Sequence, residues 1–177
     1  MLTIALYILG GIILLVLLIG FTSPQIAKME RSVMINVTPD KIWPYLNNLK
    51  TFVDNWSPWT EKDLNAEHHF NEIAEGVGAF YSWKGAPKKI GEGSMEIKIS
   101  EAKELVKVHL EFKGRGAAMA GWIIRDNGDG TSMVTWDFES DNGMNPISRI
   151  FGRMMDKFLG PDYQNGLNKL KTVCEGQ

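Results

Sequence analysis

Regular alternation of apolar and polar residues in the second half of the chain constrains the fold more than any other feature. Within Leu105–Lys113, every second residue from Val106 onward is apolar, and the residues between are charged or polar. The segments Ser94–Ser100 and Met133–Glu139 repeat this pattern. A period of two is typical of a β-strand with one dry face. Strands of this kind predict a sheet whose dry face another part of the chain must cover.

Further strand-like segments precede and separate these three. They are Ser32–Val37, His68–Ile73, Ala79–Lys84 and Ala118–Arg125. Most of the connections are short, and Asp126–Gly130, which consists of Asp, Asn and Gly, is typical of a hairpin turn. About seven strands joined in this way predict an antiparallel, meandering sheet.

A pair of short helices is expected after the first strand. Thr38 and Pro39 have the residue types of an N-cap and of a first helical position. The apolar residues that follow are spaced for one helical face. Pro44 and the Asn47–Asn48 pair interrupt this segment, so we predict two short helices with a bend between them.

The C-terminal segment carries the apolar stripe that would cover the sheet. Pro146 lies near the expected helix start, and apolar residues follow it at helical spacing: Ile147, Ile150, Phe151, Met154, Met155 and Phe158. Gly160–Pro161 is expected to kink or break the helix. Apolar residues at the same spacing then continue to Cys174, which predicts a long C-terminal helix.

The N-terminal segment is not globular. Leu2–Phe21 is uncharged and long enough to cross a bilayer. Because no basic residue precedes it and a poor cleavage sequence follows it, we predict a retained single-pass membrane anchor; a cleaved signal sequence is the alternative. Lys28 and Arg31 follow the span, so the positive-inside rule favours a cytoplasmic location for the rest of the chain. We therefore expect an anchor at 1–21, a linker at 22–28 and one domain at 29–177.

Composition and motifs argue against several classes of function. The net charge is −2 and the basic residues are scattered, so we expect no nucleic-acid partner. The chain contains no phosphate-binding loop, nucleophile elbow or dinucleotide fingerprint, and we expect no cofactor. His68 and His69 are adjacent and would face opposite sides of a strand, so we expect no metal site.

The order of a strand, a helical pair, antiparallel strands and a long final helix resembles the helix-grip superfamily called SRPBCC. That superfamily includes START lipid-binding domains, plant pollen-allergen-like proteins and aromatic polyketide cyclases, and the chain looks most like its membrane-anchored, polyketide cyclase-like bacterial members. The segments that carry the resemblance are Ile35–Leu46, Asn55–Asp63, Gly91–Met95 and Tyr163–Lys171. The resemblance implies an α+β fold in which a curved antiparallel sheet of about seven strands wraps around the C-terminal helix.

The resemblance also implies an internal cavity that opens near the helical pair. Aromatic residues and methionines occupy the positions expected to line it: Tyr81, Trp83, Trp122, Trp136, Phe151, Met154, Met155 and Phe158. Trp56 and Trp59 flank Pro58 close to the expected entrance, and either ring would be core or cavity wall. The same apolar stripes would also suit a solid core.

Three functions are compatible with these features. The first is a membrane-tethered domain that binds a hydrophobic small molecule or lipid in the cavity. The second is a cyclase or dehydratase that acts on an aromatic polyketide-like substrate, which requires an acid–base group facing the cavity. Tyr81 is the ionisable candidate, because alternation directs His109 away from the dry face; no catalytic set is identified. The third is a structural or interaction module with a solid interior.

Overall fold

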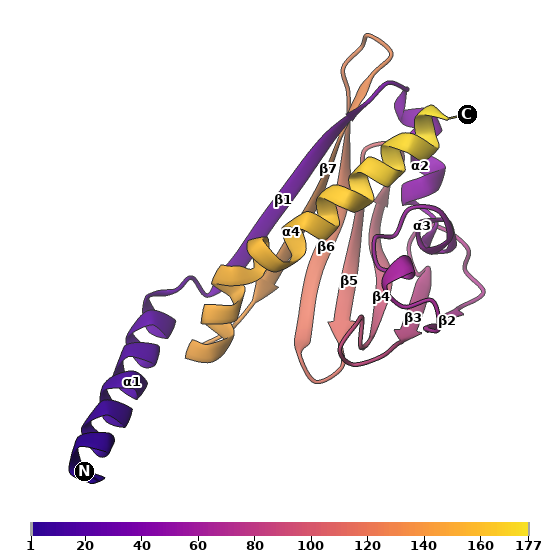
Figure 1. Ribbon diagram of the computed structural model, residues 1–177. Helices are drawn as coiled ribbons and strands as arrows, with labels where there is room; N and C mark the ends of the chain where they lie inside the picture. The colour runs from indigo at the N-terminus through magenta and orange to yellow at the C-terminus, as the bar shows by residue number, and fades with distance from the viewer. Residues whose placement is uncertain (1, 177) are drawn as a thin grey trace.

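The computed structural model describes residues 2–176, so Met1 and Gln177, the outer ends of the expected anchor and domain, lie outside the described residues. Its elements in chain order are α1 (Leu2–Thr22), β1 (Ile26–Ile35), α2 (Pro39–Leu46), α3 (Leu49–Asn55), the 3-10 turn η1 (Thr60–Lys62), β2 (Glu67–Phe70), β3 (Phe80–Lys84), β4 (Glu92–Glu101), β5 (Leu105–Phe112), β6 (Gly116–Asp126), β7 (Ser132–Asp141) and α4 (Pro146–Glu175). The expected helix-grip arrangement is confirmed: a curved sheet lies against one long helix (Figure 1).

The sheet has seven strands in the order β1-β7-β6-β5-β4-β3-β2, and all neighbours are antiparallel. Strands β2 to β7 form the predicted meander, and β1 adds to the free edge of β7. Alternation sets the two faces, as β5 illustrates: Val106 and Val108 are buried, whereas Lys107 between them is partly exposed. The dry face therefore points toward α4.

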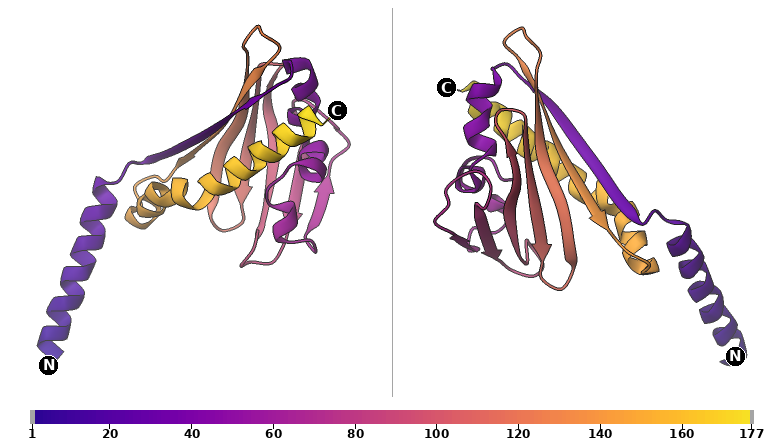
Figure 2. Two further views of the ribbon diagram at one scale, coloured as in Figure 1. Left: turned by 45° about the horizontal axis from the view of Figure 1, so that its top comes forward. Right: turned by 180° about the vertical axis from the view of Figure 1, so that it is seen from behind.

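The C-terminal half of α4 and the two short helices lie on the same side of the sheet (Figure 2). The core lies between them and the dry face. Trp122 of β6 pairs with Trp136 of β7, and both rings are almost fully buried. Tyr163 of α4 stacks on Trp136 with a distance of 4.0 Å between ring centroids. Phe52 of α3 packs against the same group, 6.0 Å from Trp136. The helix, the sheet and the helical pair thus meet in one aromatic cluster.

Two elements differ from the sequence-based expectation. Strand β1 begins at Ile26, so part of the expected 22–28 linker belongs to the sheet, where residues 26–35 pair with β7 along their whole length. Helix α4 runs without a break through Pro161. Of the kink or break expected at Gly160–Pro161, the break does not occur, because packing of the following turns on the sheet outweighs the one backbone hydrogen bond that proline cannot make.

Helix α1 projects away from the sheet (Figure 1). Within residues 2–176 it is the one helix long and apolar enough to span a membrane, with a mean hydropathy of 2.9 over Thr3–Thr22 and 6% of the most apolar window buried. Its last turn contacts the start of α4, where Gly20 lies directly against Pro146.

Candidate functional site

A cavity of about 220 Å³ lies inside the grip, between the sheet, the middle of α4 and the segment 57–62. We call it the grip cavity. Its apolar wall comes from the inward positions of five strands: Tyr81, Trp83, Met95, Leu110, Phe112, Ala120, Trp136 and Phe138. Because strand residues two apart share a face, the alternation seen in the sequence itself places these side chains on one wall.

Polar side chains gather at one end of the grip cavity. They come from the segment 57–62, from β2, from the loops at one end of the sheet and from α4: Ser57, Thr60, Lys62, His68, Lys89, Arg115 and Asp162. The cavity therefore has an apolar interior and a mixed, charged rim. An amphipathic molecule would match this distribution.

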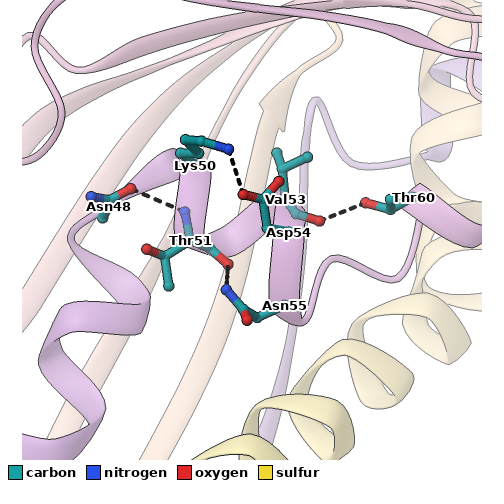
Figure 3. Close-up of polar contacts among 7 residues, drawn as sticks. All are labelled: Asn48, Lys50, Thr51, Val53, Asp54, Asn55 and Thr60. Carbon is teal, nitrogen blue, oxygen red and sulfur yellow. Dashed lines mark hydrogen bonds and ion pairs between the residues drawn. The ribbon is translucent and has the colours of Figure 1, made fainter.

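The segment 57–62 forms one side of the rim, and hydrogen bonds hold it against α3 and α4. Asn48 caps α3 by accepting a hydrogen bond from the Thr51 amide at 3.0 Å, and the Thr60 hydroxyl donates to the Val53 carbonyl at 2.9 Å (Figure 3). Beyond it, Lys62 donates to Asp162 of α4 at 2.6 Å. The rim is thus supported from two sides.

Asp63 holds the 85–91 loop, which contributes Lys89 to the rim, in place. Its buried carboxylate accepts a hydrogen bond from the Ala86 amide at 2.7 Å and pairs with Lys89 at 3.2 Å. The pKa of Asp63 is lowered, chiefly by the Ala86 hydrogen bond and despite the opposing effect of desolvation. This carboxylate is better explained as a support for the 85–91 loop than as a ligand contact.

The two tryptophans around Pro58 have different roles. Trp59 lines the grip cavity, and its indole Nε1 donates to Asp162 Oδ2 at 3.1 Å. Trp56 is 1% exposed, donates through Nε1 to the Tyr45 carbonyl at 2.9 Å, and does not line the cavity. The tertiary structure therefore assigns Trp59 to the wall and Trp56 to the core.

The remaining predicted lining residues divide in the same way. Tyr81, Trp83 and Trp136 line the grip cavity, whereas Trp122 lies in the core outside its lining. The α4 residues expected on the wall lie outside the lining of this cavity: Phe151, Met154, Met155 and Phe158. The small residues Gly152 and Gly160 occupy the face of α4 toward β1, where an added Cβ would meet Ala27 or Arg31. That packing leaves Phe151 and Phe158 more than half exposed.

Two tyrosine hydroxyls in the grip cavity lack protein partners. Neither Tyr81 nor Tyr163 makes a hydrogen bond within the described chain, although each side chain is almost fully buried. Burial raises the pKa of both phenols, and the charge of Asp137 adds to the effect at Tyr163. Both hydroxyls are therefore protonated at neutral pH and available to a ligand.

Sequence reasoning missed several residues of the site, and His68, Asp162 and Tyr163 are the ones whose polar groups matter most. His68 is partly buried beside Tyr81, with ring centroids 6.0 Å apart, and its Nδ1 is buried without a hydrogen-bond partner in residues 2–176. Desolvation lowers the pKa of His68, with a smaller contribution from His69, against the opposing charge of Asp54. Alternation with Phe70, which stacks on Tyr81, was the signal that would have placed His68 on the inner side. No sequence signal marked Asp162.

Over residues 2–176, no group of three or more His, Cys, Asp or Glu side chains forms a possible metal site.

Comparisons with known proteins agree with this architecture. No protein of curated function is significantly similar to the chain in sequence. Similar solved structures include a protein of unknown function from Staphylococcus aureus, with a TM-score of 0.63, 10% identity, and coverage of 85% of this chain and 94% of that one. A truncated norcoclaurine synthase from Thalictrum flavum is similar with a TM-score of 0.59 and 13% identity, and the match covers 86% of this chain and 95% of that one. A protein from Chromobacterium violaceum has a TM-score of 0.58 and 9% identity, and the match covers 84% of this chain and 97% of that one. At these identities the likeness is one of fold.

The sequence profile described as "Polyketide cyclase / dehydrase and lipid transport" matches residues 27–175, which include every strand but the first residue of β1 and all of α2, α3 and α4. The chain belongs to this polyketide cyclase/dehydrase and lipid transport family, within the SRPBCC-like helix-grip proteins.

Proposed function

We propose that this protein is a membrane-tethered domain that binds a hydrophobic small molecule or lipid in the grip cavity. The observation that carries the proposal is the cavity itself, about 220 Å³ of space whose apolar wall consists of aromatic and aliphatic side chains and one methionine, Met95. Protein interiors are otherwise close-packed, and voids larger than a water molecule are few. A cavity of this size therefore argues against the alternative of a structural module with a solid interior.

The composition of the wall suggests the class of ligand. Its aromatic and aliphatic side chains favour an apolar body, and flexible Met95 adapts to its shape. The hydroxyls of Tyr81 and Tyr163 would hydrogen-bond one or two polar atoms on that body. The volume lies below the range of about 300–1,000 Å³ that is usual for drug-sized ligands. We therefore expect a small apolar molecule, or one arm of a lipid.

The tether is the second part of the proposal. Helix α1 has 21 residues, and at 1.5 Å per residue it would extend about 31 Å, close to the ~30 Å hydrocarbon core of a bilayer. In this proposal residues 1–21 are the anchor and the rest of the chain forms one domain on the cytoplasmic side. Recovery of the full chain in the membrane fraction after alkaline carbonate extraction would support the anchor. Release by carbonate would refute it.

Ligand binding is tested by filling the grip cavity. Ala120 lines it on β6, and Ala120→Leu would place three more carbon atoms inside. The matched control is Ala117→Leu on the same strand, where the side chain is exposed. The purified full chain is incubated with a lipid extract and analysed by native mass spectrometry. We expect ligand adducts on the wild type and on Ala117→Leu but not on Ala120→Leu; a wild type without adducts would refute the proposal.

A second candidate function, polyketide cyclization or dehydration, is favoured by one observation. His68 and Tyr81 lie together in the grip cavity, and desolvation lowers the pKa of His68, which favours the neutral imidazole that a general base requires. The family description includes cyclases and dehydrases. If the protein is an enzyme, Tyr81→Phe and His68→Gln should each abolish turnover of an aromatic polyketide-like substrate. Their ligand adducts in native mass spectrometry should persist. Turnover that both variants retain would exclude this pair from catalysis.

A further inference from the structure

The N-terminal half of α4 exposes a row of large apolar side chains. Ile147, Phe151, Met154 and Phe158 have exposed fractions of 56, 59, 39 and 55%. Their spacing of four, three and four residues places them on one narrow face of the helix. We call these four residues the α4 stripe. Gly152 and Gly160 pack toward β1, so the stripe points away from the sheet. Within residues 2–176, none of the four belongs to the core cluster or packs against it as a partly buried residue, and all four remain exposed.

The α4 stripe begins where α1 ends. Gly20, in the last turn of α1, lies directly against Pro146, the first residue of α4. Figures 1 and 2 show the end of α1 near the start of α4. The length of α1 matches the thickness of the hydrocarbon core. If α1 spans that core, Gly20 therefore lies at its boundary. The start of α4 must then lie at the same depth. Ile147 is the next residue, and Phe151 is about one turn further along.

The charges around the stripe suit a phospholipid surface. Asp156 is the one acidic residue between Pro146 and Leu159, and it pairs with Arg31 at 2.7 Å. Arg153 and Lys157 are exposed and have no ion-pair partner within the described residues. Apolar side chains on one face with basic residues beside them are typical of helices that lie in the membrane interface.

We propose that the α4 stripe lies in the surface of the bilayer and holds the domain against it. This inference rests on the proposed membrane tether and adds a second contact to it. The stripe extends about 17 Å from Ile147 to Phe158 at 1.5 Å per residue, and Leu159 and Asp162 just beyond it line the grip cavity. The arrangement would bring the α4 side of the cavity next to the bilayer, so that a lipid-soluble ligand reaches it through a short path.

A second copy of the chain is the competing occupant of the stripe. A stable protein interface commonly buries ~800 Å² on each partner and uses about 20–30 residues a side. A single row of four side chains is much narrower than this. A bilayer needs no matching surface and accepts a narrow amphipathic face.

The test measures the depth of individual side chains in the full chain. Single cysteines replace Phe151, Phe158 or, as an aqueous control, Asn127 in the β6–β7 turn, all in a Cys174→Ser background. Each carries an environment-sensitive fluorophore, and the chain is reconstituted at one copy per nanodisc of phosphatidylcholine and anionic phosphatidylglycerol. Quenching by brominated lipid and by aqueous iodide is then compared. Circular dichroism checks that each labelled chain is folded.

We expect the labels at 151 and 158 to be quenched by brominated lipid and protected from iodide, and the label at 127 to behave in the opposite way. Stripe labels that are quenched by iodide alone, in a chain that resists carbonate extraction, would overturn the stripe proposal while leaving the tether intact. Release of the chain by carbonate would instead refute the tether. Protection that appears only when two copies share a disc would assign the stripe to a dimer interface and overturn the lipid assignment.

Discussion

Replacing Trp56 and Trp59 separately should divide stability from ligand binding. Trp56 is 1% exposed and lies 4.7 Å from Phe52, 5.4 Å from Trp136 and 5.5 Å from Trp122 between ring centroids. Truncation of a buried Trp to Ala costs about 3–5 kcal/mol, because both transfer free energy and packing are lost. Against a typical total of about 5–15 kcal/mol, Trp56→Ala should strongly lower the free energy of unfolding.

Replacement of Trp59 should instead impair ligand binding more than stability. Its side chain is partly exposed, and one of its contacts is a hydrogen bond to Asp162, which keeps Lys62 as a second partner. We expect Trp59→Ala to cost less than about 3 kcal/mol, below the range for a fully buried ring. Because Trp59 forms part of the cavity wall, the variant should lose ligand adducts while it remains folded.

The assay combines urea unfolding of the full chain in micelles, followed by circular dichroism, with native mass spectrometry of ligand adducts. Trp43 supplies the matched control, since it is also partly exposed but lies on α2 outside the cavity lining. Trp43→Ala should keep its adducts. The reasoning would be refuted if folded Trp59→Ala bound ligand like the wild type. An unfolding free energy of Trp56→Ala equal to that of the wild type would also refute it.

Three further predictions follow from single contacts or from charge. Gly166→Ala would place a Cβ 2.7 Å from the Trp136 ring, so thermal denaturation should show a loss of about 1–3 kcal/mol from overpacking, which exposed Asn165→Ala should not. The pKa of Asp63 is lowered mainly by the Ala86 amide, so its stabilising effect is complete above the unfolded value of about 3.9 and fades as pH falls through the lower folded value. Asp63→Asn should therefore flatten the acid side of a stability–pH curve; an unchanged slope would contradict this. Alkaline phosphatase or a fluorescent protein fused at the C-terminus should report the location of the domain, and we expect fluorescence without phosphatase activity, because the positive-inside rule favours the cytoplasm. Phosphatase activity would place the domain on the opposite side of the membrane.

Much of the fold could be predicted from local patterns. The period of two in β4, β5 and β7 defined both the strands and their dry face, because successive side chains in a strand point to opposite sides. The apolar residues at helical spacing after Pro146 predicted α4, and the uncharged stretch after Met1 predicted an apolar helix. Tyr81, Trp83 and Trp136 were placed on the cavity wall by the same alternation, together with the resemblance to helix-grip proteins.

The sequence by itself thus determined the elements, the buried faces and the family. Only the tertiary structure decided which apolar residues meet one another. Periodicity treated all residues of the α4 face alike, yet the glycine contacts with β1 turn Phe151 outward, while Tyr163 stacks on Trp136. Trp56 and Trp59 likewise share a short local sequence, and one lies in the core while the other forms the cavity wall. A local pattern reports which face of an element is apolar, whereas the packing angle and distance between elements determine whether that face meets a sheet, a cavity or the surroundings.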